Sequence, residues 1–162
     1  MEPIIAELKH QYHTTLSMYQ GVVEACTDEI WEKKFEGASF LTFWREAYHT
    51  LFWLHNFLGD KDKTFAMQPF GEDIDPRTFT PPNNMCERAA ALEYAAQTQA
   101  RIDEIFDAMT RDELTGPDHY DESDFRNVYH RLMYGLFHGQ YHIGRLAAYL
   151  DQEGIERSYW QG

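Results

Sequence analysis

Two histidines near the end of the chain, His138 and His142, are separated by three residues. Residues four apart project from one face of a helix about one turn from each other, so both imidazoles can bind a single metal ion. His49 is a third ligand candidate if its helix faces the last one, and Trp53, one turn later, would then form a wall of a substrate pocket. Three imidazoles leave one or two coordination positions open, which is typical of catalytic metal sites.

Neutral imidazole nitrogens bind zinc, nickel, copper and iron, so the donor set predicts a divalent ion without choosing its identity. The alternative is a plain helical bundle in which these histidines are incidental. His55 lies six residues beyond His49 and should face another direction. The remaining histidines fit surface or loop positions better, and they are His10, His13, His119 and His130.

Two arginines share the expected helix face of the two late histidines, because Arg131, His138, His142 and Arg145 are spaced by seven, four and three residues. Two cations that flank a divalent ion repel it and need a compensating anion. An anionic substrate bound by Arg131 or Arg145 would serve. The alternative is an ion pair within the chain, with Glu46 or another carboxylate.

Apolar residues recur every three or four positions in four segments, which is the period of an amphipathic α-helix. The predicted helices cover Glu2–Cys26, Phe40–Leu58, Asn84–Met109 and a segment from near Asp121 or Ser123 to Gln152. A short turn capped by Thr27 follows the first helix. The expected core faces are Ile5, Leu8, Tyr12, Leu16, Tyr19, Val23 and Cys26; Leu41, Trp44, Tyr48, Leu51 and Phe52; Leu92, Ala96, Ile102, Ile105 and Phe106; and Phe125, Tyr129, Leu132, Leu136, Ile143, Ala147 and Leu150.

The boundaries of these helices carry recognisable capping residues. Ser39 is a plausible N-cap for the second helix, and Gly59 closes it. Asn84 and Glu87 resemble a capping box that opens the third. Between them, Gly59–Pro82 contains four prolines and no sustained period, which predicts a long connection. We therefore predict an all-α protein without a sheet, a single four-helix bundle of residues 1–162 with one long crossover between its second and third helices.

The composition limits the partners. The net charge of −13 and the lack of a Lys/Arg cluster argue against nucleic acid or an anionic membrane surface. No apolar run approaches the ~20 residues of a membrane span, and the first residues contain no basic signal segment. Cys26 and Cys86 do not suggest a disulfide framework. We expect a cytoplasmic protein that acts on a small molecule.

The position of His49 in the second helix, with His138 and His142 in the motif that runs to Leu146, resembles the DinB superfamily of metalloenzymes. The resemblance covers nearly the whole chain. It implies a bundle with up-down-down-up helix order, a three-histidine metal site that holds zinc or nickel, or else iron, and a homodimer. The chain has Tyr141 where the family often has a further histidine, and Arg145 where it often has glutamine.

Characterised relatives in that family include bacillithiol and mycothiol S-transferases and a mycothiol-dependent maleylpyruvate isomerase. The resemblance therefore implies an enzyme that binds a low-molecular-weight thiol as its thiolate at the metal and directs it at an electrophile. A hydrolase that uses a metal-bound hydroxide is the enzymatic alternative. A metal-stabilised binding or stress-response module is the non-catalytic alternative.

Overall fold

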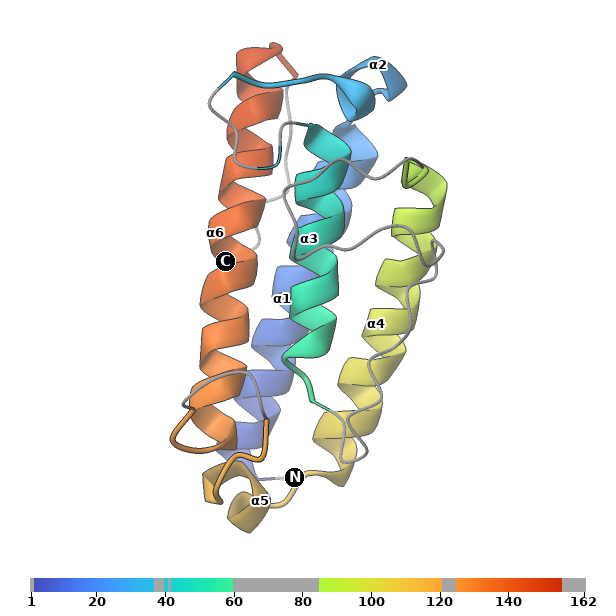
Figure 1. Cartoon of the computed structure of the whole chain (residues 1–162). Helices are drawn as coiled ribbons and strands as arrows, with labels where there is room; N and C mark the ends of the chain where they lie inside the picture. Colours follow the sequence, from blue (N-terminus) through green and yellow to red (C-terminus); the bar gives the residue numbers. More distant parts are fainter. Residues whose placement is uncertain (1, 37–39, 41, 60–84, 121–124, 156–162) are drawn as a thin grey trace.

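The computed structural model describes residues 2–36, 40, 42–59, 85–120 and 125–155 of the 162-residue chain. Four long helices form the body of the molecule, and they are α1 (Pro3–Ala25), α3 (Phe43–Asn56), α4 (Arg88–Ala108) and α6 (Val128–Gln152). Two short helices, α2 (Asp28–Glu32) and α5 (Arg111–Thr115), lie at opposite ends (Figure 1). The all-α prediction is confirmed, since the described residues form no β-strand and contain one isolated bridge, between Lys34 and Thr42.

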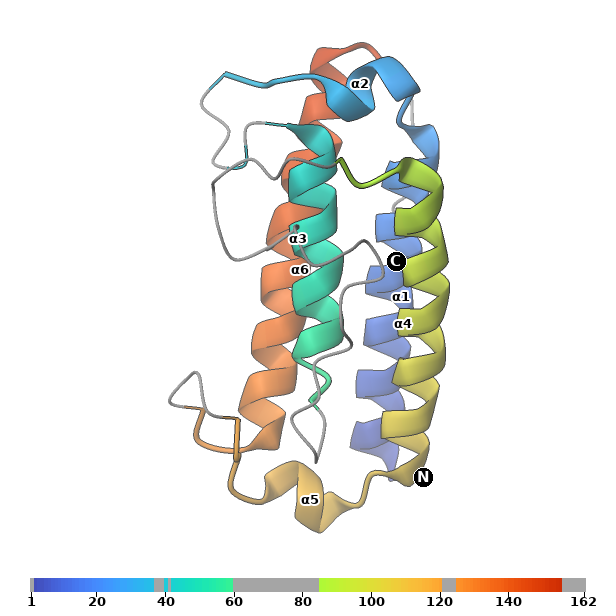
Figure 2. The same cartoon turned by 45° about the vertical axis from the view of Figure 1, so that its right-hand side comes forward.

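The four long helices run up, down, down and up, in the order implied by the resemblance (Figures 1 and 2). α3 and α6 lie side by side, and α1 and α4 form the neighbouring pair. α3 runs towards the end of the bundle that carries α5, whereas α4 begins at the end that carries α2. The predicted crossover between them falls on residues 60–84, outside the described part of the chain. None of the described helices combines the length and the apolar character that crossing a membrane requires.

The second predicted helix is shorter than expected at both ends. α3 begins at Phe43 rather than Phe40. Thr42 has extended backbone angles, φ −126° and ψ 155°, and takes part in the isolated bridge, so the helix cannot start before it. At the other end, α3 stops at Asn56 rather than Leu58.

The later helices also begin downstream of their predicted starts. Glu87 is itself the N-cap of α4, which begins at Arg88, and so it does not occupy the third position of a capping box. Asn127 caps α6 by accepting a hydrogen bond from the backbone N–H of His130 at 2.8 Å. The other predicted start residues lie outside the described part of the chain, and they are Ser39, Asn84, Asp121 and Ser123.

Both short helices have capped N-termini. The hydroxyl of Thr27 accepts a hydrogen bond from the backbone N–H of Ile30, as predicted for the turn after the first helix. α5 was not predicted, although its sequence holds a clear signal. Thr110 and Glu113 form a reciprocal capping box, in which each side chain binds the other's backbone N–H.

The predicted core face of α1 is confirmed, and its residues are Ile5, Leu8, Tyr12, Leu16, Tyr19, Val23 and Cys26. On α4 the predicted face is partly wrong, because Ala96 is exposed while Tyr94 and Thr98 are buried. On α6, Tyr129 is 36% exposed rather than in the core. Of the residues predicted for the core face of α4, only Ile102 and Phe106 are buried, and Leu92 and Ile105 are half-buried.

Two glycines permit the N-terminal half of α6 to approach its neighbours closely. A Cβ atom on Gly135 would lie 2.7 Å from the Tyr12 hydroxyl and 2.8 Å from Cβ of Phe57. Gly59, just after α3, has φ +78°, and a Cβ there would overlap the Arg131 guanidinium. These contacts set α6 tightly against α1 and the end of α3.

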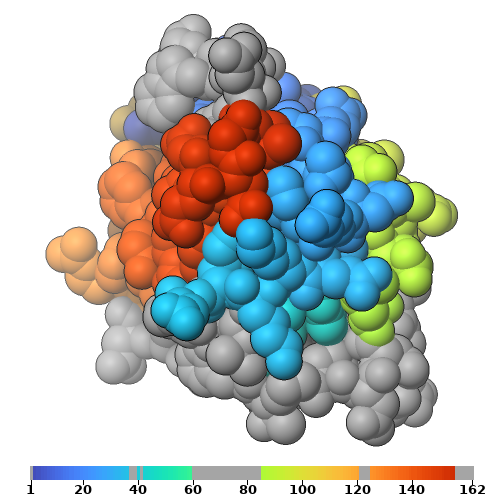
Figure 3. Space-filling view, turned by 90° about the horizontal axis from the view of Figure 1, so that it is seen from above, coloured from blue at the N-terminus to red at the C-terminus, as the bar shows by residue number. Residues whose placement is uncertain are grey.

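The other end of the bundle is closed by α2 and the residues that follow it. Seen from this end, those residues lie against the C-terminal end of α6 (Figure 3). Lys33 binds the carboxylate of Glu153 there at 2.6 Å. Trp31 donates its indole N–H to the carbonyl of Cys86 at 2.7 Å, which ties α2 to the residues that lead into α4.

Candidate metal centre

The three predicted ligands meet between α3 and α6. One ligand atom each from His49, His138 and His142 lies within 4.8 Å of the other two. Nε2 of His49 and Nε2 of His138 are 3.3 Å apart. Two nitrogens bound at about 2.0–2.1 Å to one tetrahedral zinc ion are roughly 3.3–3.4 Å apart, so this spacing fits a shared ion.

The centre is partly enclosed by aromatic rings. His49 and His142 are buried, and His138 is half-buried. The ring of Phe40 lies 4.2 Å from that of His49, centroid to centroid. Trp53 lies 6.2 Å from His49 and 6.3 Å from His138, beside the histidines as the sequence predicted.

The carboxylate of Glu46 fixes the orientation of one ligand. Glu46 lies one turn before His49 on α3 and is fully buried. Its Oε1 accepts a hydrogen bond from Nδ1 of His142 at 2.9 Å. A neutral imidazole that donates from Nδ1 keeps its lone pair on Nε2. His142 therefore offers Nε2 as a metal ligand, in the carboxylate–histidine arrangement common at zinc sites.

His138 is held in its neutral form by its surroundings. Burial, together with the nearby His142, lowers the pKa of His138 from 6.5 to about 4. A neutral imidazole is the form that binds a metal. Its Nδ1 is buried and has no hydrogen-bond partner among the described residues. The donor set as a whole, three imidazole nitrogens from two facing helices, fits zinc, nickel or iron.

Both arginines that were predicted to bind substrate have partners within the chain. Nε of Arg145 lies 2.9 Å from Oε1 of Glu46, which is the intramolecular pair considered as the alternative. Arg131 is buried and pairs with Asp118 at 2.8 Å. It also donates a hydrogen bond to the carbonyl of Phe57. These pairs satisfy much of the charge of both guanidinium groups.

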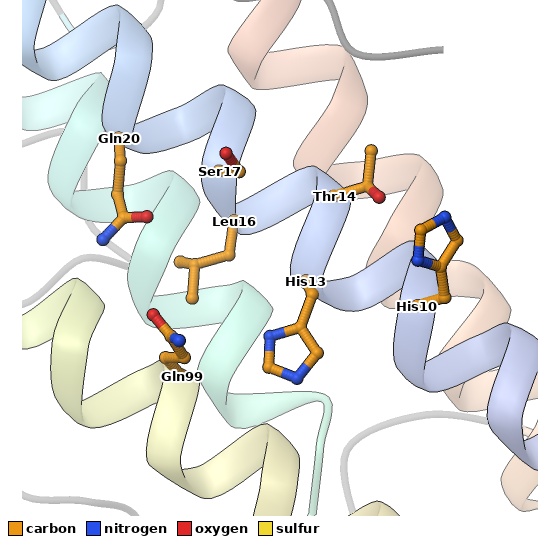
Figure 4. Close-up of a pocket in the computed structure, with 7 residues that line it drawn as sticks. All are labelled: His10, His13, Thr14, Leu16, Ser17, Gln20 and Gln99. Carbon is orange, nitrogen blue, oxygen red and sulfur yellow. The ribbon is translucent and has the colours of Figure 1, made fainter.

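Two of the remaining histidines, His55 and His13, have other partners. Nδ1 of His55 lies 3.1 Å from the hydroxyl of Thr98 on α4, so it faces away from the other three histidines as predicted. His13 lies 3.0 Å from a carboxylate oxygen of Asp103. His10 and His13 line a cavity of about 410 Å³ between α1 and α4, in which their rings point in different directions (Figure 4).

Sequence reasoning missed the position of Glu46 beside the ligand and the role of Tyr149. Tyr149 donates its hydroxyl proton to Oε2 of Glu46 at 3.0 Å. A signal existed for both. Glu46 precedes His49 by three residues and Tyr149 follows His142 by seven, so each shares a helix face with a ligand.

A sequence profile of the DinB superfamily matches residues 11–146, a stretch that contains all three histidines. No curated protein and no solved structure matches the chain. The family match and the histidine geometry therefore point to the same residues.

Proposed function

The chain belongs to the DinB superfamily, and we propose that it is a metal-dependent S-transferase for a small thiol. The observation that carries the proposal is the convergence of His49, His138 and His142 within 4.8 Å on two facing helices. Three protein ligands leave room for a further ligand. A divalent ion held there, zinc or nickel before iron, would supply the positive charge that makes a coordinated thiol a thiolate at neutral pH.

In the proposed transfer, the thiol sulfur forms a bond to an electrophilic carbon. The leaving group departs with the electrons of its bond to that carbon, and the thiol proton goes to solvent. The nucleophile must come from outside the chain, because its own thiols are unsuited. Cys26 and Cys86 are buried, and burial raises the pKa of each thiol to about 12.

The charges around the centre favour an anionic ligand. Glu46 and Arg145 form a neutral pair beside the histidines, and the imidazoles add no charge. A divalent ion held by three imidazoles would keep its double charge. A thiolate would reduce that charge.

Two further side chains are proposed to contact the substrate. Trp53, half-buried beside His49 and His138, would form an apolar wall. Arg145 is 22% exposed at its side chain and would direct a free N–H of its guanidinium towards a substrate carboxylate. Arg131 is not part of this proposal, since Asp118 and the Phe57 carbonyl already occupy it.

The proposal is tested with protein in which Co²⁺ is the only added metal. We expect glutathione, as a representative small thiol, to produce a saturable near-ultraviolet thiolate-to-cobalt charge-transfer band. S-methylglutathione, which cannot form a thiolate, should not. The band should vanish in the His138→Ala/His142→Ala variant and persist in His55→Ala, whose imidazole binds Thr98 instead. Cobalt binding with no such band for any small thiol would contradict thiol activation.

We also propose a homodimer that forms through α6. This helix exposes three aromatic side chains close together, Tyr134 by 45%, Phe137 by 65% and Tyr141 by 60%. A contiguous apolar patch of this kind is a common feature of protein interfaces. Light scattering at micromolar concentration should give twice 19.1 kDa for the wild type and 19.1 kDa for Phe137→Glu. A wild-type mass of 19.1 kDa would overturn the dimer.

A further inference from the structure

We propose that Glu46 is a positioning residue for the metal centre, which fixes His142 in the tautomer whose Nε2 faces the other two histidines. The proposal rests on the metal centre described above. Its starting point is the 2.9 Å contact between Oε1 of Glu46 and Nδ1 of His142. A carboxylate can only accept a hydrogen bond, so Nδ1 must carry a proton, and in the neutral imidazole that binds a metal the lone pair then lies on Nε2.

The carboxylate itself is held from the α6 side. Arg145 and Tyr149 lie three and seven residues after His142, on the same stripe of α6. Nε of Arg145 lies 2.9 Å from Oε1 of Glu46, and Tyr149 donates its hydroxyl to Oε2 at 3.0 Å. Arg145 also donates from Nη2 to the Tyr149 hydroxyl at 2.9 Å. Each of the three side chains therefore contacts the other two.

Tyr149 is suited to this role because it remains a donor. Burial raises the pKa of Tyr149, so its hydroxyl keeps its proton at neutral pH. Its ring stacks on Phe35 with a centroid distance of 4.3 Å and an interplanar angle of 17°. The ring contact and the two hydrogen bonds together fix the hydroxyl beside Glu46.

A fully buried carboxylate is costly unless charged or polar donors surround it. Glu46 has three such donors, from His142, Arg145 and Tyr149. His138 provides the contrast, because its Nδ1 has no hydrogen-bond partner among the described residues. The tautomer of His142 is thus fixed by the protein before a metal binds, whereas that of His138 is not fixed in this way.

The first test needs no variant. In metal-free wild-type protein, ¹⁵N NMR of the histidine side chains should find that the neutral form of His142 carries its proton on Nδ1 and not on Nε2. The second test measures zinc affinity by competition with a chelator. Glu46→Gln should weaken zinc binding by about 10–100-fold, the usual effect of removing a carboxylate that orients a histidine ligand. Tyr149→Phe removes one hydroxyl and should weaken it by a smaller factor.

Asp118→Asn is the matched control. Asp118 is also a buried carboxylate paired with an arginine, Arg131, but neither residue has a described contact with His142. This control should lower thermal stability and leave zinc affinity unchanged. Glu46→Asp should restore only part of the zinc affinity lost in Glu46→Gln. Its shorter side chain keeps the negative charge but places the carboxylate farther from Nδ1 of His142.

The outcomes separate the two proposals. If wild-type protein binds no zinc, nickel or iron, the metal centre and the role of Glu46 both fail. If the wild type binds zinc, but Glu46→Gln and Tyr149→Phe bind it equally well and His142 carries its proton on Nε2, the positioning role is overturned while the metal centre stands.

Discussion

The two helix pairs of this bundle have different interiors. Seven of the nine buried polar or charged side chains in the described part of the chain lie on α3 or α6, and they are Arg45, Glu46, His49, Thr50, Asn56, Arg131 and His142. α1 and α4 contribute one each, Thr15 and Thr98. The buried part of their contact is otherwise built from apolar and aromatic residues such as Tyr12 and Phe106, whose rings are 5.3 Å apart.

The difference separates the residues that stabilise this helical bundle from those that form its candidate metal centre. Buried polar groups destabilise a fold unless they are paired, so the α3–α6 interface depends on specific hydrogen bonds. Apolar packing between α1 and α4 has no such requirement and can hold the bundle together. Changes to the apolar α1–α4 pair should therefore alter stability, and changes to the polar α3–α6 pair should alter the site.

The largest expected effect on stability comes from the apolar pair. Phe106→Ala removes a fully buried ring that packs on Tyr12 and should lower the free energy of unfolding by about 3–5 kcal/mol. Metal content per folded chain should not change. Denaturant unfolding and elemental analysis of the same sample check both parts, and loss of metal without loss of stability would break the comparison.

A smaller effect is expected where α6 meets α1. Gly135→Ala places a Cβ atom 2.7 Å from the Tyr12 hydroxyl and should destabilise the protein by about 1–3 kcal/mol through overpacking. Gly144 is the matched control on the same helix, since a Cβ there meets nothing within 4 Å. Gly144→Ala should stabilise by up to about 1 kcal/mol, from helix propensity alone. Equal effects in thermal melts would argue against the close approach.

The last expected effect is a pH dependence that belongs to the site rather than to the apolar pair. Because the pKa of His138 is lowered from 6.5 to about 4 in the folded protein, the unfolded state binds more protons between these values. The contribution of His138 to the free energy of unfolding should thus be constant above pH 6.5 and fall as the pH drops towards 4. Metal-free wild type should lose stability faster over this range than His138→Leu, which cannot titrate. Parallel pH profiles would show that His138 is not shielded from protonation.

The sequence predicted the features that depend on local periodicity. The stripe from Ile5 to Cys26 needs only the 3.6-residue period, and the four-residue spacing of His138 and His142 needs only a helix. Thr110 and Glu113 show that even a clear capping box is easily overlooked beside longer helices. Burial at the edge of a stripe was harder to predict, because it depends on which neighbouring helix covers it.

Features that depend on contacts between helices could not be read in the same way. The spacing of Arg145 along the sequence is compatible with binding either a substrate or Glu46. The ion pair with Glu46 is seen only when α3 and α6 are placed side by side. The extended backbone that continues to Thr42 and so delays the start of α3 likewise depends on a bridge to a residue eight positions away. Long-range pairing of this kind leaves no periodic signal in one sequence.

The central claim is that α3 and α6 hold one divalent metal ion. Elemental analysis of protein purified without a histidine tag tests it most directly. The account predicts about one zinc, nickel or iron ion per chain in the wild type and in His55→Ala, and none in His138→Ala/His142→Ala. A wild-type protein without metal that also fails to bind added zinc, or a double variant that keeps one ion per chain, would contradict it.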